Sequence, residues 1–131
     1  MKRQAINPVD WSLRFGFNQG ELIEGQGKLL FCSGQVATDE RGAPQHADDV
    51  RAQMGLAMDN LESVLAGADM TLSNVVRLTI YTPEIDEVFQ NFDAITSRLD
   101  AANVKPAQTL LGVARLALPQ FKIEIEATAA A

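Results

Sequence analysis

Histidine and cysteine, on which much catalytic and metal-binding chemistry depends, occur only once each in this chain of 131 residues. The single cysteine, Cys32, cannot form an internal disulfide, which agrees with a reducing compartment, and its apolar neighbours indicate a packing role. The single histidine, His46, lies in a turn-rich segment, so a Ser–His or Cys–His nucleophile pair is not indicated. We expect His46 to be solvated and expect no metal site, although Asp48 and Asp49 follow it closely.

Basic residues and long apolar runs are also few. The 11 Lys and Arg against 17 Asp and Glu give a formal net charge of −6, and no basic cluster is denser than Lys2-Arg3. This charge disfavours nucleic acids and membrane surfaces as partners. The longest apolar run, at residues 29–32, is too short to span a membrane, and no secretory signal is recognisable. We therefore expect a cytoplasmic protein whose partner is a small molecule or another protein.

The sequence contains no internal repeat, linker or glycine-rich phosphate-binding motif, so it predicts one domain, residues 1–131, and no nucleotide cofactor. The residue pattern predicts an α+β fold with the element order β-β-α-β-α-β-β. Expected strands cover residues 21–24, 28–33, 74–81, 109–115 and 122–128, the first two forming a hairpin. Helices are expected from about Asp48, after a surface loop at 34–47, and from Thr82, with Thr82 as N-cap and Pro83 as the first helical residue. The alanine-rich C-terminus is expected to fray.

The two predicted helices have one apolar stripe each, so they can cover only one face of the sheet. Near the C-terminus, isoleucines alternate with Glu124 and Glu126, and Arg77 lies out of step with Leu78 on its own strand, so charge is expected on the other face. That face could be solvated, with Glu and Arg paired across strands. Apolar residues on both faces of segments 29–31 and 110–111 favour its burial in an oligomer instead.

Five segments form a pattern that runs through most of the chain: LFCSGQ at 30–35, Asn60-Leu61, Asn91, KPAQT at 105–109 and KIEIEA at 122–127. This pattern resembles the RidA/YjgF family of reactive-intermediate deaminases, also labelled endoribonuclease L-PSP. The resemblance implies a chorismate-mutase-like fold with a mixed sheet and two helices on one face. It also implies a homotrimer whose sheets surround a barrel-like core, with small-molecule clefts between subunits. Family members with deaminase activity hydrolyse imines or enamines without a metal or cofactor.

The resemblance further implies roles for individual residues. Glu124 matches the glutamate that positions or activates the attacking water. Gln108 stands where the family motif Pro-Ala-Arg-Ser/Thr has an arginine that binds the substrate carboxylate, with the backbone N–H of Leu110 completing that anchor. The remaining expected binding residues are two polar cleft residues, Ser33 and Asn91, and an apolar one, Phe17, near the place where many members have tyrosine.

Gln108 departs from the family pattern because its amide carries no charge. Hydrogen bonds to charged groups are strong, so the loss would weaken carboxylate binding by roughly 10- to 150-fold. Arg77 or Arg115 could supply the missing charge, or Arg115 could instead pair with Glu124 or Glu126 at the trimer interface. The leading hypothesis is a Rid-type hydrolase with an atypical carboxylate site. The alternative is a weakly catalytic or non-catalytic trimer that binds a small molecule or has a regulatory role, and a ribonuclease ranks last.

Overall fold

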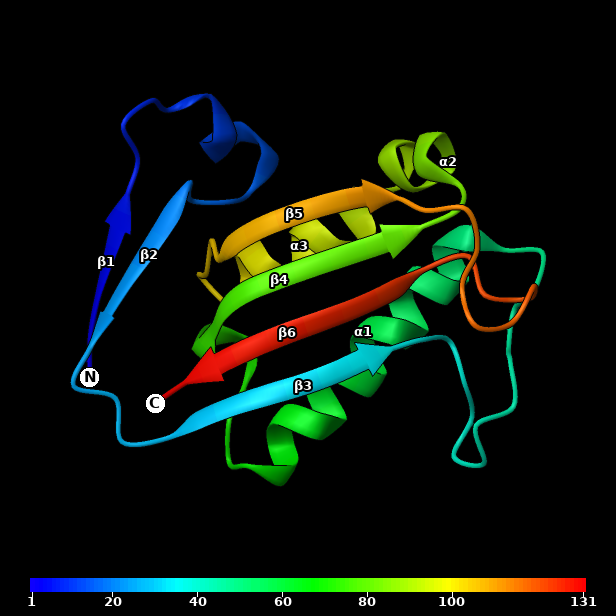
Figure 1. Ribbon diagram of the computed structural model, residues 1–131, viewed down its shortest axis with the longest axis horizontal. Helices are drawn as coiled ribbons and strands as arrows, with labels where there is room; N and C mark the ends of the chain where they lie inside the picture. The colour runs from blue at the N-terminus through cyan, green and yellow to red at the C-terminus, as the bar shows by residue number, and fades with distance from the viewer.

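The computed structural model describes residues 1–131 and shows an α+β fold with six strands and three α-helices (Figure 1). The elements are β1 (Lys2–Ile6), a 3-10 helix η1 (Trp11–Phe15), β2 (Gly20–Glu24), β3 (Leu29–Gln35), α1 (Val50–Gly67), a 3-10 helix η2 (Leu72–Asn74), β4 (Val75–Thr82), α2 (Ile85–Gln90), α3 (Asp93–Ala101), β5 (Ala107–Gly112) and β6 (Glu124–Ala130). The main sheet has the strand order β3-β6-β4-β5, and α1 and α3 lie against one of its faces (Figure 1). Only the β4–β5 pair is parallel, so the sheet is mixed, as the family resemblance implies.

Helix α1 supplies the largest part of the core. Asp49 caps it by accepting a hydrogen bond from the Ala52 N–H at 2.9 Å, which confirms the predicted start. Its apolar stripe, including Met54, Met58 and Leu61, is fully buried against the sheet. The helix therefore forms where the 3.6-residue periodicity of the sequence places it.

The alternation of side chains on the central strands also follows the prediction. Leu78 and Ile80 on β4 and Ile123 and Ile125 near the start of β6 are fully buried on the helix-covered face. The first residues of β4 differ, because a bulge between Val75 and Arg77 places Val75 in the core and leaves its neighbour only half-buried.

The predicted hairpin of the first two strands is wrong. β2 pairs with β1, and β3 pairs with β6 in the other sheet. β1 was not predicted, because its residues contain no apolar run. The turn at Gly25, which has a φ of 67°, directs the chain from one sheet to the other. The expected fraying of the C-terminus is also wrong: the Ala131 carbonyl accepts hydrogen bonds from the N–H groups of Gly27 and Lys28, both at 2.9 Å.

The predicted second helix is two helices, α2 and α3, and it begins later than expected. Thr82 ends β4, and its hydroxyl oxygen accepts a hydrogen bond from the Glu84 N–H at 2.9 Å, so it closes a turn before the helix instead of capping it. Strand β5 begins two residues before the predicted start and ends three before the predicted end, and β6 is displaced two residues toward the C-terminus.

The face of the sheet away from the helices carries large exposed apolar side chains beside its charged ones. Phe31 is 74% exposed, Leu29 50% and Leu111 44%. Isolated exposed apolar residues are normal, but a group on one open sheet face is typical of an interface. No helix combines the length and the apolar character needed to cross a membrane.

Candidate functional site

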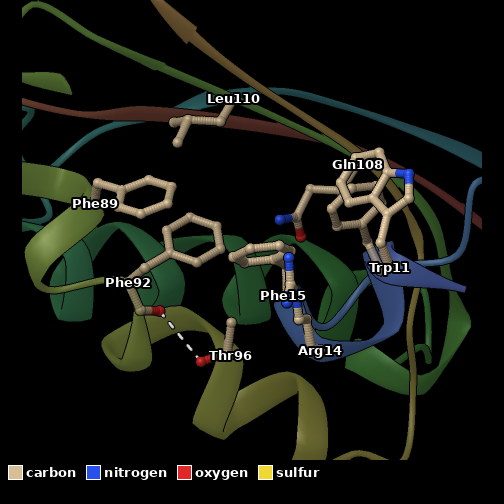
Figure 2. A pocket seen from close by; sticks show the side chains of 9 residues that line it. Trp11, Arg14, Phe15, Phe89, Phe92, Thr96, Gln108 and Leu110 are labelled. Carbon is tan, nitrogen blue, oxygen red and sulfur yellow. Dashed lines mark hydrogen bonds between the residues drawn. The ribbon is translucent and has the colours of Figure 1, made fainter. Parts of the chain in front are cut away.

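A cavity of about 520 Å³ lies between the N-terminal 3-10 helix, the helices α2 and α3, and the edge strand β5 (Figure 2). Its volume is in the range that accommodates small organic ligands. Its lining is mostly aromatic: Trp11, Arg14, Phe15, Phe17, Phe89, Phe92, Thr96, Gln108 and Leu110. Three residues expected from the sequence, Phe17, Gln108 and Leu110, are thus brought together here.

The pairing of β5 with β4 explains why Gln108 and Leu110 point into this cavity. Gln108 is paired with Leu78 and Leu110 with Ile80, and both β4 residues are buried on the helix-covered face. Residues opposite one another on paired strands share a face, so Gln108 and Leu110 also point to the helix side. Figure 2 shows the Gln108 amide directed over Phe15 toward the middle of the cavity.

Apart from Phe17, the N-terminal wall of the cavity was not expected from the sequence. Trp11 packs edge-to-face on Phe15 and Phe17, with ring centroids 6.2 and 5.8 Å apart, and Phe15 also meets Phe89 at 6.5 Å. Gly16, with a φ of 81°, ends the 3-10 helix and lets the two phenylalanines flank the turn. The sequence feature that could have indicated this wall is the clustering of Trp11, Phe15 and Phe17 within seven positions.

The cavity contains few polar groups, among them a buried amide oxygen without a partner and the guanidinium of the exposed Arg14. The Oε1 atom of Gln108 is buried and has no hydrogen-bond partner. The guanidinium of Arg14 lies 5.0 Å from the centroid of the Phe15 ring. No carboxylate forms a salt bridge with Arg14, whereas Arg3, Arg51 and Arg98 each have one. Unpartnered buried polar atoms are uncommon and identify positions where a ligand can bind.

Glu124 and Ser33 lie on the other face of the sheet. Glu124 is paired with Tyr81 and is the neighbour of the buried Ile125, so its side chain points away from the helices. Ser33 follows the buried Cys32 and is exposed. One copy of the chain therefore places the expected general base and the aromatic cavity on opposite faces of the sheet.

The absence of a side chain at Gly34 leaves room for the observed position of Glu124. A Cβ atom at Gly34 would lie 2.0 Å from Glu124 Oε1 and 2.7 Å from its Cδ. The carboxylate thus lies directly against the backbone of β3, where a bulge interrupts the pairing with β6. The sequence pattern predicts a strand that ends at Gly34, whereas Gly34 lies within β3.

Replacing Gly34 with alanine is expected to displace the Glu124 carboxylate while leaving the fold intact, because the flexible side chain of Glu124 can move away. If Glu124 acts on a ligand, Gly34→Ala should lower activity by at least about tenfold, within the range attributed to general bases. Steady-state kinetics and a thermal melt measure both effects. A Gly67→Ala variant is the control, since no atom lies within 4 Å of its would-be Cβ and its φ is not positive. Full activity of Gly34→Ala would contradict a role for this carboxylate position.

A polar cluster surrounds Glu124 on the open face. The Tyr81 hydroxyl donates a hydrogen bond to Glu126, and this bond holds the pKa of Tyr81 above its usual range. Arg77 donates to the Thr109 hydroxyl at 2.6 Å, and Arg115 to the Leu116 carbonyl, so neither arginine lines the aromatic cavity or forms a salt bridge with a glutamate in the chain. The expected pairing of Arg115 with Glu124 or Glu126 is one across the trimer interface, and it stays a prediction.

Asn91 lies at the junction of α2 and α3, between the cavity residues Phe89 and Phe92. Its side-chain amide donates to the Glu87 carbonyl at 2.9 Å, so it closes the end of α2 and does not line the cavity. His46 is exposed in the loop before α1 and has a positive φ of 56°.

Comparison with known proteins gives consistent results over nearly the whole chain. The sequence model described as "Endoribonuclease L-PSP" matches residues 16–131. The RutC family protein YjgH of Escherichia coli is 34% identical over 125 residues, covering 95% of this chain and 94% of that protein. The mitochondrial protein mmf2 of Schizosaccharomyces pombe is 32% identical over 133 residues, covering 99% of both. The crystal structure of YyfB from Yersinia pestis, described as a conserved Rid family protein of unknown function, superposes with a TM-score of 0.84, 36% identity and full coverage of both chains.

Proposed function

Because the chain belongs to the endoribonuclease L-PSP family, to which the Rid and YjgF proteins belong, we propose that it hydrolyses reactive imines or enamines to a carbonyl compound and ammonia. The reaction takes place in a cleft between two subunits of a homotrimer. In this cleft the aromatic cavity of one subunit binds the substrate, and Glu124 of the next subunit activates water. No cofactor takes part, and the cytoplasm is the proposed compartment.

The observation that carries this proposal is the separation of the site residues within one chain. Gln108, Leu110 and Phe17 line the cavity, whereas Glu124 lies on the opposite sheet face. A glutamate next to an exposed apolar group on an open face suits a subunit interface, because burial of Phe31 and Leu111 would then stabilise the assembly that brings the two halves together.

The proposed chemistry needs one carboxylate and one water molecule. Glu124 accepts a proton from water as the water oxygen bonds to the imine carbon, and the C=N electron pair takes up a proton at nitrogen. The nitrogen of the resulting carbinolamine then receives the proton held by Glu124, and the C–N bond breaks as the hydroxyl group gives up its proton to solvent, which releases ammonia and leaves the carbonyl product. An enamine first takes a proton at carbon and becomes the imine.

The glutamine at position 108 predicts an altered substrate preference. The wild-type protein should accelerate hydrolysis of the bulky imine that an amino-acid oxidase forms from phenylalanine more than that of the small imine formed from alanine. Gln108→Arg should improve the apparent affinity for the small imine by roughly 10- to 150-fold, since a guanidinium adds charge-assisted hydrogen bonds. Release of 2-keto acid, measured against a reaction without protein, reports both rates.

The matched control is Gln26→Arg, which adds the same charge at an exposed turn. The control should behave as wild type. If the wild-type protein never exceeds the uncatalysed rate on any imine, the proposed activity is wrong for the natural chain, whether or not Gln108→Arg gains it.

A second candidate function is a trimer that binds a small molecule with little or no catalysis. The observation in its favour is the uncharged, unpartnered Gln108 amide in the cavity, where efficient family members have arginine. Ligand binding without imine hydrolysis by wild type would support it. Hydrolysis of RNA remains the least suitable reaction, because the cavity is apolar and the net charge of −6 repels phosphates.

A further inference from the structure

Arg14 is a cation at the edge of the aromatic cavity that has no anionic partner in the protein. We propose that Arg14 anchors a ligand carboxylate, and that the cavity selects carboxylates bearing a ring-sized apolar group and a neighbouring N–H or O–H donor. This inference rests on the proposed function only in taking the aromatic cavity as the place where the ligand binds.

The selectivity for an apolar group follows from the cavity walls. Four of the six phenylalanines of the chain and its only tryptophan line this one cavity. Phe89 and Trp11 are nonetheless 60% and 52% exposed, so a ligand ring placed between them would remove apolar surface from water. At about 520 Å³ the cavity is larger than a two- or three-carbon acid needs.

The polar requirement follows from Arg14 and Gln108. A guanidinium offers two parallel N–H donors, which match the two oxygens of a carboxylate. The buried Oε1 of Gln108 is an acceptor without a donor, so the ligand atom beside it should carry a hydrogen. Gln108 and Arg14 both line this cavity beside the Phe15 ring (Figure 2). In the proposed pose, one ligand end meets both polar groups while its apolar end lies toward Phe89.

Arg14 stands apart from the chain's other arginines. Arg3, Arg51 and Arg98 are paired with carboxylates, and Arg41, Arg77 and Arg115 do not line the cavity. Arg14 also precedes residues 16–131, the part that the family model matches. If Arg14 served only to cover Phe15, its removal would leave carboxylate affinity unchanged.

The test measures binding of a stable probe by the full-length wild-type protein, using calorimetry and the fluorescence of Trp11, the only tryptophan. The probe is 3-phenyllactate, which has a ring, a carboxylate and a hydroxyl; lactate lacks the ring and 3-phenyllactamide lacks the charge. We expect 3-phenyllactate to bind at least about tenfold more tightly than either analogue. In Arg14→Gln, 3-phenyllactate and 3-phenyllactamide should bind with equal affinity. Arg14→Lys should retain part of it. Arg41→Gln, the same change in an exposed loop, is the matched control and should bind as wild type.

Three results would overturn the inference: equal affinity of Arg14→Gln and wild type for 3-phenyllactate, equal affinity of wild type for the acid and the amide, or no binding of the probe. Because Arg14 is exposed, an unchanged melting temperature is expected for the variant. Binding is measured without turnover, so the outcome is separate from that of the imine assays. Probe binding with no hydrolysis would contradict the proposed activity alone, and hydrolysis unaffected by Arg14→Gln would contradict the role of Arg14 alone.

Discussion

Replacing Glu124 with glutamine should lower the kcat of imine hydrolysis by about 100- to 10,000-fold, the range attributed to a positioned general base. Glutamine keeps the shape of the side chain and its contact with the Gly34 backbone but cannot take a proton from water. Substrate binding should change little, because the aromatic cavity lies on the other face of the sheet. Ammonia and 2-keto acid release under saturating imine supply measure the effect.

Glu126→Gln is the matched control, two residues along the same strand and on the same face. A glutamine there can still accept the hydrogen bond that Tyr81 donates to the native carboxylate. We expect its activity to stay within about threefold of wild type, as is usual for changes outside the reacting groups. A Glu124→Gln protein as active as this control would exclude Glu124 as the base.

The Glu124→Gln variant also tests whether two subunits form each site. Leu110→Trp should fill the cavity and block binding while keeping Glu124, whereas Glu124→Gln keeps the cavity and loses the base. Trimers formed from an equal mixture of the two inactive chains should recover about a quarter of the wild-type activity, because one cleft in each mixed cyclic trimer is intact. No recovery, in trimers shown by mass to be mixed, would contradict a site shared between subunits.

The parts of the fold that could be predicted are those that local pattern determines. The stripe from Val50 to Leu65 and the alternation around Leu78 and Ile125 have one arrangement that buries their apolar side chains. Strand partners are not local. The sequence between residues 20 and 33 suits a hairpin, yet β1 pairs with β2 and β6 with β3. The hydrogen-bonding partners of β3 thus come from a segment distant in sequence, which the local pattern does not specify.

The residues of the candidate site also differ in how far the sequence could predict them. Gln108, Leu110, Phe17 and Glu124 could be proposed because they occupy positions in a recognisable motif pattern. Arg14 could not, because its importance depends on a 3-10 helix placing it beside α2 and β5, which are distant in sequence. Neither could the division of the site between two sheet faces be seen before the β4–β5 and β4–β6 registers were known.

A buried amide connects the core to the segment that leads into Glu124. Gln53 on α1 is fully buried; its amide nitrogen donates to the carbonyls of His46 and Gln120 at 3.1 and 2.7 Å, and its oxygen accepts from the Lys122 N–H at 2.8 Å. All its hydrogen bonds thus go to backbone groups of two irregular segments. A polar residue on the apolar stripe, three positions after Val50, was the sequence signal for this role.

Gln53→Leu should destabilise the protein by about 1–3 kcal/mol, because three part-buried hydrogen bonds to the backbone are lost together. Leucine is apolar and similar in size, so the loss reports hydrogen bonding more than packing. Urea unfolding at one fixed protomer concentration, with Gln90→Leu on an exposed helix end as control, measures the difference. Because Lys122 lies two residues before Glu124, folded Gln53→Leu protein should also lose activity. A change below about 1 kcal/mol would mean that water replaces the amide at all three backbone groups, and the link between α1 and the start of β6 would then be dispensable.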